Sequence, residues 1–224
     1  NTYYDDKDIS TGIIEGLTGW GGAVAFDVNA HDATIKNSKF LNNIAMRTGG
    51  AISFANGAVN NTVLNSTFDN NTAHRSGGAI YWNGDNGIVN NNTFTNNTAF
   101  HDGGAIFWGG IYLKEYLGNN GTINNNTFTQ NQAGQAGGAI DFISHNGTIN
   151  NNTFIQNQVI GSGGAIGLCG DNGTINNNTF TNNTAHDGGA ICGGVYGEKD
   201  GVGHNGTINN NTFTNNTADV GGTT

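Results

Sequence analysis

The chain has 224 residues, and Asn (41), Gly (38) and Thr (26) together occupy nearly half of it, while Pro is absent. Only 10% of the residues are charged and the net charge is −9. This excludes a nucleic acid or an anionic membrane surface as the expected partner, because both require a basic patch. The polar bias alone is also compatible with Asn-rich disorder, so the order of the residues has to decide.

The N-terminal segment shows no targeting signal. Residues 1–11 lack the basic and apolar parts of a secretory signal peptide, and no apolar run approaches the roughly 20 residues of a membrane-spanning helix. Since the single Met is Met46, we expect a mature or excised piece of a longer precursor, with no direct membrane insertion of this chain.

Two sequence marks recur along the chain. The first is Gly-Gly-Ala followed by an aliphatic residue, repeated at intervals of 25 to 34 residues. Its first glycines are Gly21, Gly49, Gly77, Gly103, Gly137, Gly163 and Gly188. The second is a Phe with an aliphatic residue five positions before it and an Asn three positions after it. Its phenylalanines are Phe40, Phe68, Phe94, Phe128, Phe154, Phe180 and Phe213. A steady period of this length indicates a repeat protein.

The residues between the marks decide the repeat architecture. Asn, Thr and Gly are poor in helix interiors, which argues against helical repeats, and the Leu ladder of leucine-rich repeats is missing. We therefore predict an all-β fold, a right-handed single-stranded parallel β-helix (β-solenoid). It should have about seven to eight coils of 25–34 residues, with equivalent positions stacked about 4.8 Å apart.

The side-chain parity predicts which residues face the interior. The aliphatic residue after Gly-Gly-Ala, the residue two positions later and the repeat Phe should all point inward. The aliphatic residue five positions before the Phe reaches the same interior only if the chain bends between them, for example at an Asn in the left-handed region. We expect this corner at Asn37, Asn65, Asn91, Asn125, Asn151, Asn177 and Asn210, with their side chains hydrogen-bonded from coil to coil. A second corner ladder is expected at Asn43, Asn71, Asn97, Asn131, Asn157, Asn183 and Asn216.

The chain is expected to form one β-helical domain over residues 1–224, with residues 1–20 as an irregular or edge segment. Two repeats carry insertions, at residues 109–120 and 193–205. Insertions of a solenoid fall on one loop face, which is often the face that binds. Because no capping helix is visible at either end, we expect a fragment of, or a subunit in, a longer assembly.

The first insertion is apolar and aromatic, and it suggests a weak binding site. Together with two aromatic residues expected to point outward nearby, it would form an exposed platform for a sugar or a partner protein. The candidate residues are Tyr81, Phe107, Ile111, Tyr112, Leu113, Tyr116 and Leu117. The alternative is that the loop folds over and buries its own apolar residues.

Catalytic and metal chemistry has little support in the sequence. Polysaccharide lyases and hydrolases on β-helices need carboxylates on neighbouring coils, and in the outward slot after the inward Ile Asp141 stands alone. We therefore predict a protein that is not an enzyme and has no cofactor. His145, Asp171 and His204 recur at one turn and are weak metal candidates, although a hydrogen-bonded turn ladder explains them equally well.

Cys169 and Cys192 are expected on adjacent coils, offset by two positions. A straight stack would leave their Cα atoms about 8 Å apart, beyond the usual reach of a disulfide. The disulfide therefore stays uncertain, with two buried thiols as the other possibility.

The repeat motifs resemble those of known surface proteins. Gly-Gly-Ala-Ile with Phe-x-x-Asn is similar to the repeat of chlamydial polymorphic outer-membrane proteins, which are adhesins. The phrase from Asn172 to Ala185 more closely resembles the Asn/Thr-rich adhesin-like surface proteins of methanogenic archaea. The resemblance implies an extracellular β-helix engaged in attachment or envelope building. Nothing in this chain resembles the autotransporter barrel of the chlamydial proteins.

Fifteen Asn-x-Ser/Thr sequons are consistent with an extracellular location. Most arise because the consensus sequence of the repeat itself contains Asn-x-Thr, and we expect those in the corner ladders to be inaccessible. The glycosylation candidates are the Asn-Gly-Thr turns at Asn120, Asn146, Asn172 and Asn205.

The function expected from the sequence is that of an extracellular, non-catalytic structural or adhesive protein of the cell surface. Its partners would be other copies of itself, associating end to end or laterally, or other surface proteins and glycans. A self-assembling fibre or sheath subunit and a carbohydrate-active enzyme are alternatives. An ice-binding protein is a further one, because outward Thr-x-Thr pairs such as Thr93 with Thr95 recur, although Lys39, Asp69 and Ile155 interrupt them.

Overall fold

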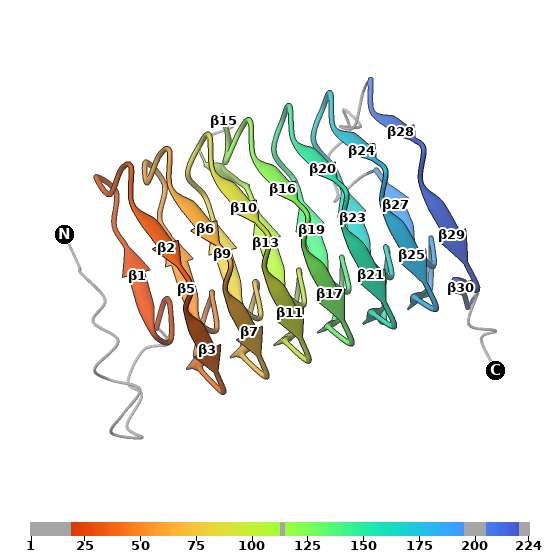
Figure 1. Cartoon of the computed structure of the whole chain (residues 1–224), viewed down its shortest axis with the longest axis horizontal. Coiled ribbons are helices and arrows are strands. Elements are labelled where there is room, and N and C mark those ends of the chain that lie inside the picture. Colours follow the sequence, from red (N-terminus) through yellow and green to blue (C-terminus); the bar gives the residue numbers. More distant parts are fainter. Residues whose placement is uncertain (1–18, 113–114, 195–204, 220–224) are drawn as a thin grey trace.

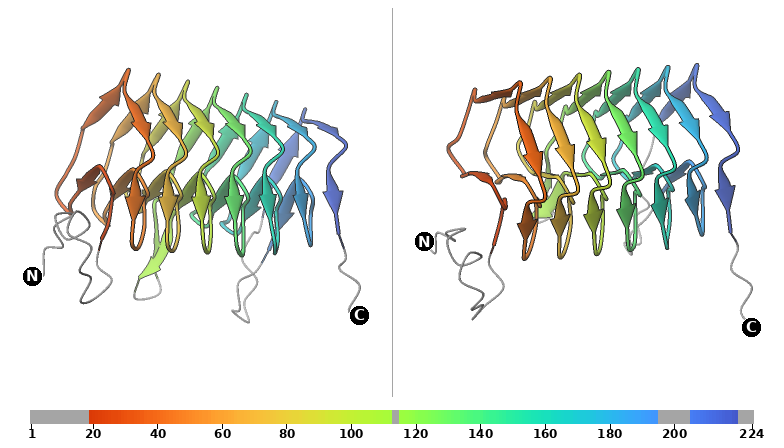
Figure 2. Two further views of the ribbon diagram at one scale, coloured as in Figure 1. Left: turned by 90° about the horizontal axis from the view of Figure 1, so that it is seen from below. Right: turned by 60° about the horizontal axis from the view of Figure 1, so that its bottom comes forward.

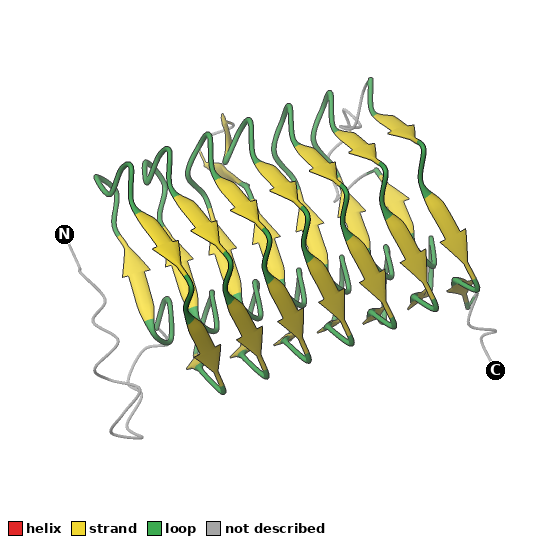
Figure 3. Cartoon of the chain, viewed as in Figure 1, coloured by secondary structure: helices red, strands yellow, loops and turns green. Residues whose placement is uncertain are grey.

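The computed structural model describes residues 19–112, 115–194 and 205–219, and of residues 111, 112 and 115 it describes the backbone alone. The chain winds into a stack of coils, so that equivalent strands lie side by side along the long axis (Figure 1). Four parallel sheets of seven strands each result. The described residues contain strands and loops but no helix (Figure 3). The predicted parallel β-helix is confirmed.

Each coil contributes one short strand to each sheet. The first sheet holds β1 (Val24–Phe26), β5 (Ile52–Phe54), β9 (Ile80–Trp82), β13 (Ile106–Trp108), β19 (Ile140–Phe142), β23 (Ile166–Leu168) and β27 (Ile191–Gly193). The second holds β2 (Thr34–Lys36), β6 (Thr62–Leu64), β10 (Ile88–Asn90), β16 (Thr122–Asn124), β20 (Thr148–Asn150), β24 (Thr174–Asn176) and β28 (Thr207–Asn209).

The third sheet carries the repeat phenylalanines, and the fourth closes the coil. The third holds β3 (Lys39–Leu41), β7 (Thr67–Asp69), β11 (Thr93–Thr95), β17 (Thr127–Thr129), β21 (Thr153–Ile155), β25 (Thr179–Thr181) and β29 (Thr212–Thr214). The fourth holds β4 (Ile44–Ala45), β8 (Thr72–Ala73), β12 (Thr98–Ala99), β18 (Gln132–Ala133), β22 (Gln158–Val159), β26 (Thr184–Ala185) and β30 (Thr217–Ala218).

The interior is filled by columns of identical or similar side chains, as predicted. Phe94 stacks on Phe128 with 4.8 Å between the ring centroids and 5° between the ring planes, and the neighbouring Phe pairs repeat this geometry. A second aromatic column runs through Phe54, Trp82 and Trp108. Because the ring separation equals the strand spacing of a sheet, the stacking and the backbone hydrogen bonds reinforce one register.

The second corner carries the expected buried Asn ladder. Asn97 is fully buried, and Asn131 on the next coil accepts bonds from its backbone N–H and from its Nδ2. Nδ2 of Asn97 also donates to the carbonyl of Phe68 on the preceding coil. One amide thus joins three coils, and the pattern repeats from Asn43 to Asn216. The ladder satisfies buried polar groups that would otherwise be costly.

At the first corner the expectation is half right. Asn91 and its equivalents do have positive φ, so they make the predicted bend. Their side chains, however, are exposed, and the buried ladder is formed by the next residue in each coil. Asn92 donates from its N–H and Nδ2 to Oδ1 of Asn126. This ladder runs through Ser38, Ser66, Asn92, Asn126, Asn152, Asn178 and Asn211.

Candidate functional site

The outer face of the first sheet is covered by the segment that leads into each of its strands. This segment, here called the Gly-Gly arch, joins a strand of the fourth sheet to the next strand of the first sheet, as residues 100–105 do between β12 and β13. Arches of adjacent coils pair with each other, for example through the bridge between Asp102 and Ala136. A Cβ placed on Gly167, which lies in β23, would be 3.5 Å from Cβ of Ala136. Side chains on this face are therefore enclosed.

Tyr81 and Phe107 lie on this covered face. Their rings stack at 5.1 Å with 3° between the planes. Phe107 is only 9% exposed and Tyr81 is half-buried, with its hydroxyl oxygen accepting a bond from Nδ2 of Asn83 at 3.0 Å. Burial raises the pKa of the Tyr81 hydroxyl. The expectation of an exposed aromatic platform at this pair is corrected, because the arch covers the residues that strand parity turns outward.

Asp141 lies on the same face with a buried carboxyl group. It is 1% exposed, and its Oδ1 occupies the space that the missing side chain of Gly167 leaves, 2.7 Å from where a Cβ would be. Oδ1 has no hydrogen-bond partner within the described part of the chain. Burial raises the pKa of Asp141 well above its ordinary value, and the nearby Asp102 carboxylate raises it further.

Asp102 comes from the arch and was not singled out by the sequence. Its Oδ2 accepts a weak bond from the Ser76 hydroxyl at 3.4 Å, and burial raises its pKa as well. The sequence does contain a pattern that could have identified it, because a polar residue often precedes Gly-Gly directly. These residues are Thr48, Ser76, Asp102, Ser162 and Asp187. Asp141 remains the single carboxylate of its slot, but the arch brings a second carboxyl group near it.

The two cysteines are free thiols in the structure. Gly167 pairs with Cys192, so Cys169, which directly follows β23, is offset from Cys192 by two positions, as the spacing predicted. Cys169 is buried and its Sγ donates to the carbonyl of Gly194 at 3.4 Å. Burial and the nearby Asp141 carboxyl raise the pKa of Cys169 to about 12. This thiol is therefore a poor nucleophile.

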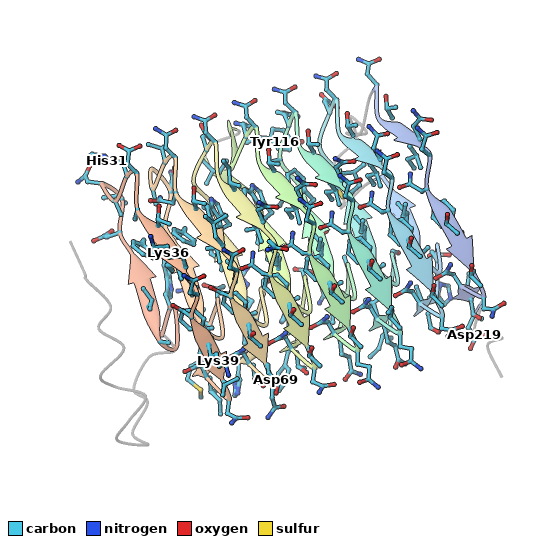
Figure 4. All side chains as sticks on the ribbon, in the orientation of Figure 1. His31, Lys36, Lys39, Asp69, Tyr116 and Asp219 are labelled. Carbon is cyan, nitrogen blue, oxygen red and sulfur yellow. The ribbon has the colours of Figure 1, made fainter. Side chains whose placement is uncertain are left out.

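The first insertion forms a small hairpin on the side of the stack. β14 (Gly110–Tyr112) pairs antiparallel with β15 (Glu115–Leu117) and projects from the coils (Figure 2). Tyr116, labelled in Figure 4, is half-buried and its ring lies 4.0 Å from that of His145. Leu117 is also half-buried. Leu113 lies outside the described residues, as do the side chains of Ile111 and Tyr112, so their part in binding stays a prediction.

The turn residues His145 and Asp171 form a ladder. The backbone N–H of Asp171 donates to Nδ1 of His145 at 3.0 Å, and the N–H of His145 donates to Oδ1 of Asn119 at 3.0 Å. This Nδ1 is therefore already engaged. His204, the third weak metal candidate, lies outside the described residues, which contain no cluster of three or more His, Cys, Asp or Glu side chains suited to a metal.

All fifteen sequon asparagines are exposed, including those expected to be inaccessible. Each has φ between 48° and 59°. The turn candidates form a surface ladder of their own, in which Asn146 Nδ2 donates to Asn120 Oδ1 at 3.3 Å and Asn172 Nδ2 to Asn146 Oδ1 at 3.1 Å. Asn205 continues it by donating to Asn172.

The Thr-x-Thr pairs line up in register on the third sheet, where Thr93 pairs with Thr127 and Thr95 with Thr129. Lys39 and Asp69 lie on the same sheet towards the first coils (Figure 4). No helix of the described residues has the length and apolar character needed to cross a membrane.

The comparisons with known proteins agree with this architecture. A family model described as a right-handed β-helix region matches residues 12–164 and 107–223. Neither a curated protein nor a solved structure matches the chain. The family match covers most of the sequence and accords with the four parallel sheets. The chain belongs to the right-handed β-helix family.

Proposed function

We propose that this protein is a non-catalytic structural or adhesive protein of the cell surface, in which a stiff rod presents its lateral faces and one hairpin. The observation that carries the proposal is the continuity of the internal ladders. The same Asn–Asn contacts join every coil from Asn43 to Asn216. A stack tied at every coil resists bending and suits a spacer that holds a binding element away from its base.

The burial of Asp141 supports the non-catalytic part of the proposal. A catalytic carboxyl group must come within hydrogen-bond reach of its substrate. Asp141 is 1% exposed beneath the Gly-Gly arch, so no substrate reaches it without displacement of that segment. Its raised pKa follows from this enclosure.

The hairpin β14–β15 is the element best suited to adhesion. It breaks the regular outline of the coils, and its Tyr116 lies beside His145 at the edge of the turn ladder. A half-buried aromatic ring with a polar end is a common contact for sugars and for protein partners. The partner class is therefore a surface glycan or a surface protein.

The location and the binding role can be tested separately. Brief protease treatment of intact producing cells, or immunogold labelling of them, should detect the protein on the surface.

For binding, Gly109–Asn119 can be replaced by the short turn Asn-Gly-Asp that the coil of Trp82 uses at positions 83–85. The shortened protein should keep the strands of the four parallel sheets, having lost only β14 and β15, but it should no longer bind to cells or to a glycan array. Protein confined to the cell interior would refute the surface role.

A second candidate function, end-to-end self-association, rests on the last described coil. Ile208 and Phe213 are 55% and 50% exposed there, whereas their equivalents Ile175 and Phe180 are fully buried. A second copy stacked on this coil would cover these apolar positions as the next coil covers their equivalents. Analytical ultracentrifugation should show concentration-dependent association that Phe213→Asp weakens. A strictly monomeric protein at high concentration would contradict it.

A further inference from the structure

We infer that the exposed corner asparagines are acceptors of N-linked glycans, and that within one column no two adjacent coils carry glycans together. The inference builds on the proposed surface location. It concerns three columns. The turn column holds Asn60, Asn120, Asn146, Asn172 and Asn205. The first corner column holds Asn65, Asn91, Asn125, Asn151, Asn177 and Asn210. The second corner column holds Asn70, Asn96, Asn182 and Asn215.

The backbone presents each sequon in one fixed way. The Asn is exposed in the left-handed region, and the Thr two positions later begins a strand. The middle residue is buried in every coil except the last described one, where Gly206 is exposed and Asn211 and Asn216 are half-buried. In the turn column the middle residue is Gly at four of the five sequons and Asn61 at the fifth. At Asn146 a larger residue would not fit, because a Cβ on Gly147 would lie 2.1 Å from the ring of Phe142. The amide of Asn146 and the side chain of Thr148 thus flank an inward residue and are both accessible.

The surface ladder is compatible with modification. An Asn side-chain nitrogen carries two N–H bonds, and the ladder bond from Asn146 to Asn120 engages one of them. In the transfer, the Nδ2–C1 bond to the sugar forms while the bond from C1 to the pyrophosphate of a lipid-linked oligosaccharide donor breaks. Nδ2 loses one proton and the lipid pyrophosphate leaves. The remaining N–H keeps its bond to the neighbouring coil.

The coil spacing limits how many acceptors are filled. Neighbouring coils are 4.7–4.9 Å apart, as the stacked Phe rings measure. A glycan of several sugars, with hydroxyl and acyl substituents, is wider than this. A glycan on Asn146 therefore prevents the attachment of glycans to Asn120 and Asn172 in the same molecule.

The chain contains its own control position. Asn86 belongs to the turn column, has φ of 57°, is exposed, and donates to Asn60 Oδ1 at 3.2 Å. It is followed by Gly87 and Ile88, so it lacks the hydroxyl residue of a sequon. Asn86 should stay unmodified, and Ile88→Thr should convert it into an acceptor.

The test is glycopeptide mapping of the full-length native protein, isolated from the surface of producing cells, with Thr148→Ala, Thr148→Ser and Ile88→Thr made in the same organism. We expect Asn146 to lose its glycan in Thr148→Ala and to keep it in Thr148→Ser, with Tm unchanged. A surface protein whose intact mass equals its sequence mass would overturn the inference and leave the proposed location standing. Glycans on Asn146 and Asn172 of one molecule would overturn the spacing rule. Glycosylated protein absent from the surface would refute the location but support the inference.

Discussion

Asn97 gives two hydrogen bonds to the same oxygen of Asn131, from its backbone N–H at 3.0 Å and from its Nδ2 at 2.9 Å. Asn131 in turn donates to the carbonyl of Phe94 and to Oδ1 of Asn157. All four residues are fully buried. One side-chain amide therefore serves as a structural joint between coils.

Asn131→Ala should destabilise the protein strongly. The change leaves donors of Asn97 and the carbonyl of Phe94 without partners, at about 1–3 kcal/mol for each buried group. Thermal unfolding followed by circular dichroism measures the effect.

The adjacent Gln130 supplies the control. It is exposed with φ of 55°, at a position where Asn70 and Asn96 occupy the equivalent corner. Gln130→Asn should raise the free energy of unfolding by less than about 1 kcal/mol, and Tm slightly, because Asn tolerates the left-handed region better. Equal Tm values for Asn131→Ala and wild type would disprove the role of the ladder.

Asp141 should make the protein less stable as the pH rises. The folded state keeps a proton on Asp141 that the unfolded chain loses above its ordinary pKa of 3.8. The contribution of Asp141 to stability is therefore greatest below about pH 4 and declines as the pH rises to the raised pKa of the folded state. For each unit by which folding raises the pKa of Asp141, ionisation at high pH costs about 1.4 kcal/mol of stability.

Asp141→Asn removes this titration with little change of shape. Its Tm should depend on pH less steeply than that of the wild type between pH 4 and 8, with a remaining slope from Asp102, whose pKa is raised in the same direction. Parallel Tm curves for the two proteins would show that Asp141 is ionised in the folded state.

Gly147→Ala should disturb the turn above the interior. A Cβ there would lie 2.1 Å from the ring of Phe142, which is fully buried and cannot move without opening the core. We expect a loss of about 1–3 kcal/mol from overpacking. Gly193→Ala is the matched control, because nothing lies within 4 Å of its Cβ. Similar Tm losses for both variants would mean that the contact with the Phe142 ring is not the cause.

The two thiols should react at different rates. Cys169 is buried with a pKa of about 12, so it carries almost no thiolate at pH 8, whereas Cys192 is partly exposed. Iodoacetamide labelling with peptide mapping should modify Cys192 first and Cys169 only on unfolding. Recovery of a disulfide-linked peptide from the native protein would contradict the free thiols.

Much of the fold followed from periodicity. The inward columns, such as Phe94 on Phe128, are set by residue types that recur at fixed offsets, and only a stack of coils places them together. The bend at Asn91 was also predicted, because two inward residues five positions apart require a corner. The second carboxyl group near Asp141 was not predicted, since Asp102 belongs to a different coil and a different sequence slot.

The sequence by itself determined the coil and its period, because the same residue types recur at a steady interval. It also determined the inward columns and the corners, because these depend on the alternation of side chains along one strand. At the first corner only the tertiary structure decided which residue of the adjacent pair points inward. Asn91 in the left-handed region turns its side chain to the solvent, and Asn92 enters the ladder. Likewise, strand parity turns Phe107 and Asp141 outward, but the arch folds over them. Parity describes one strand, whereas burial depends on every segment that packs against it.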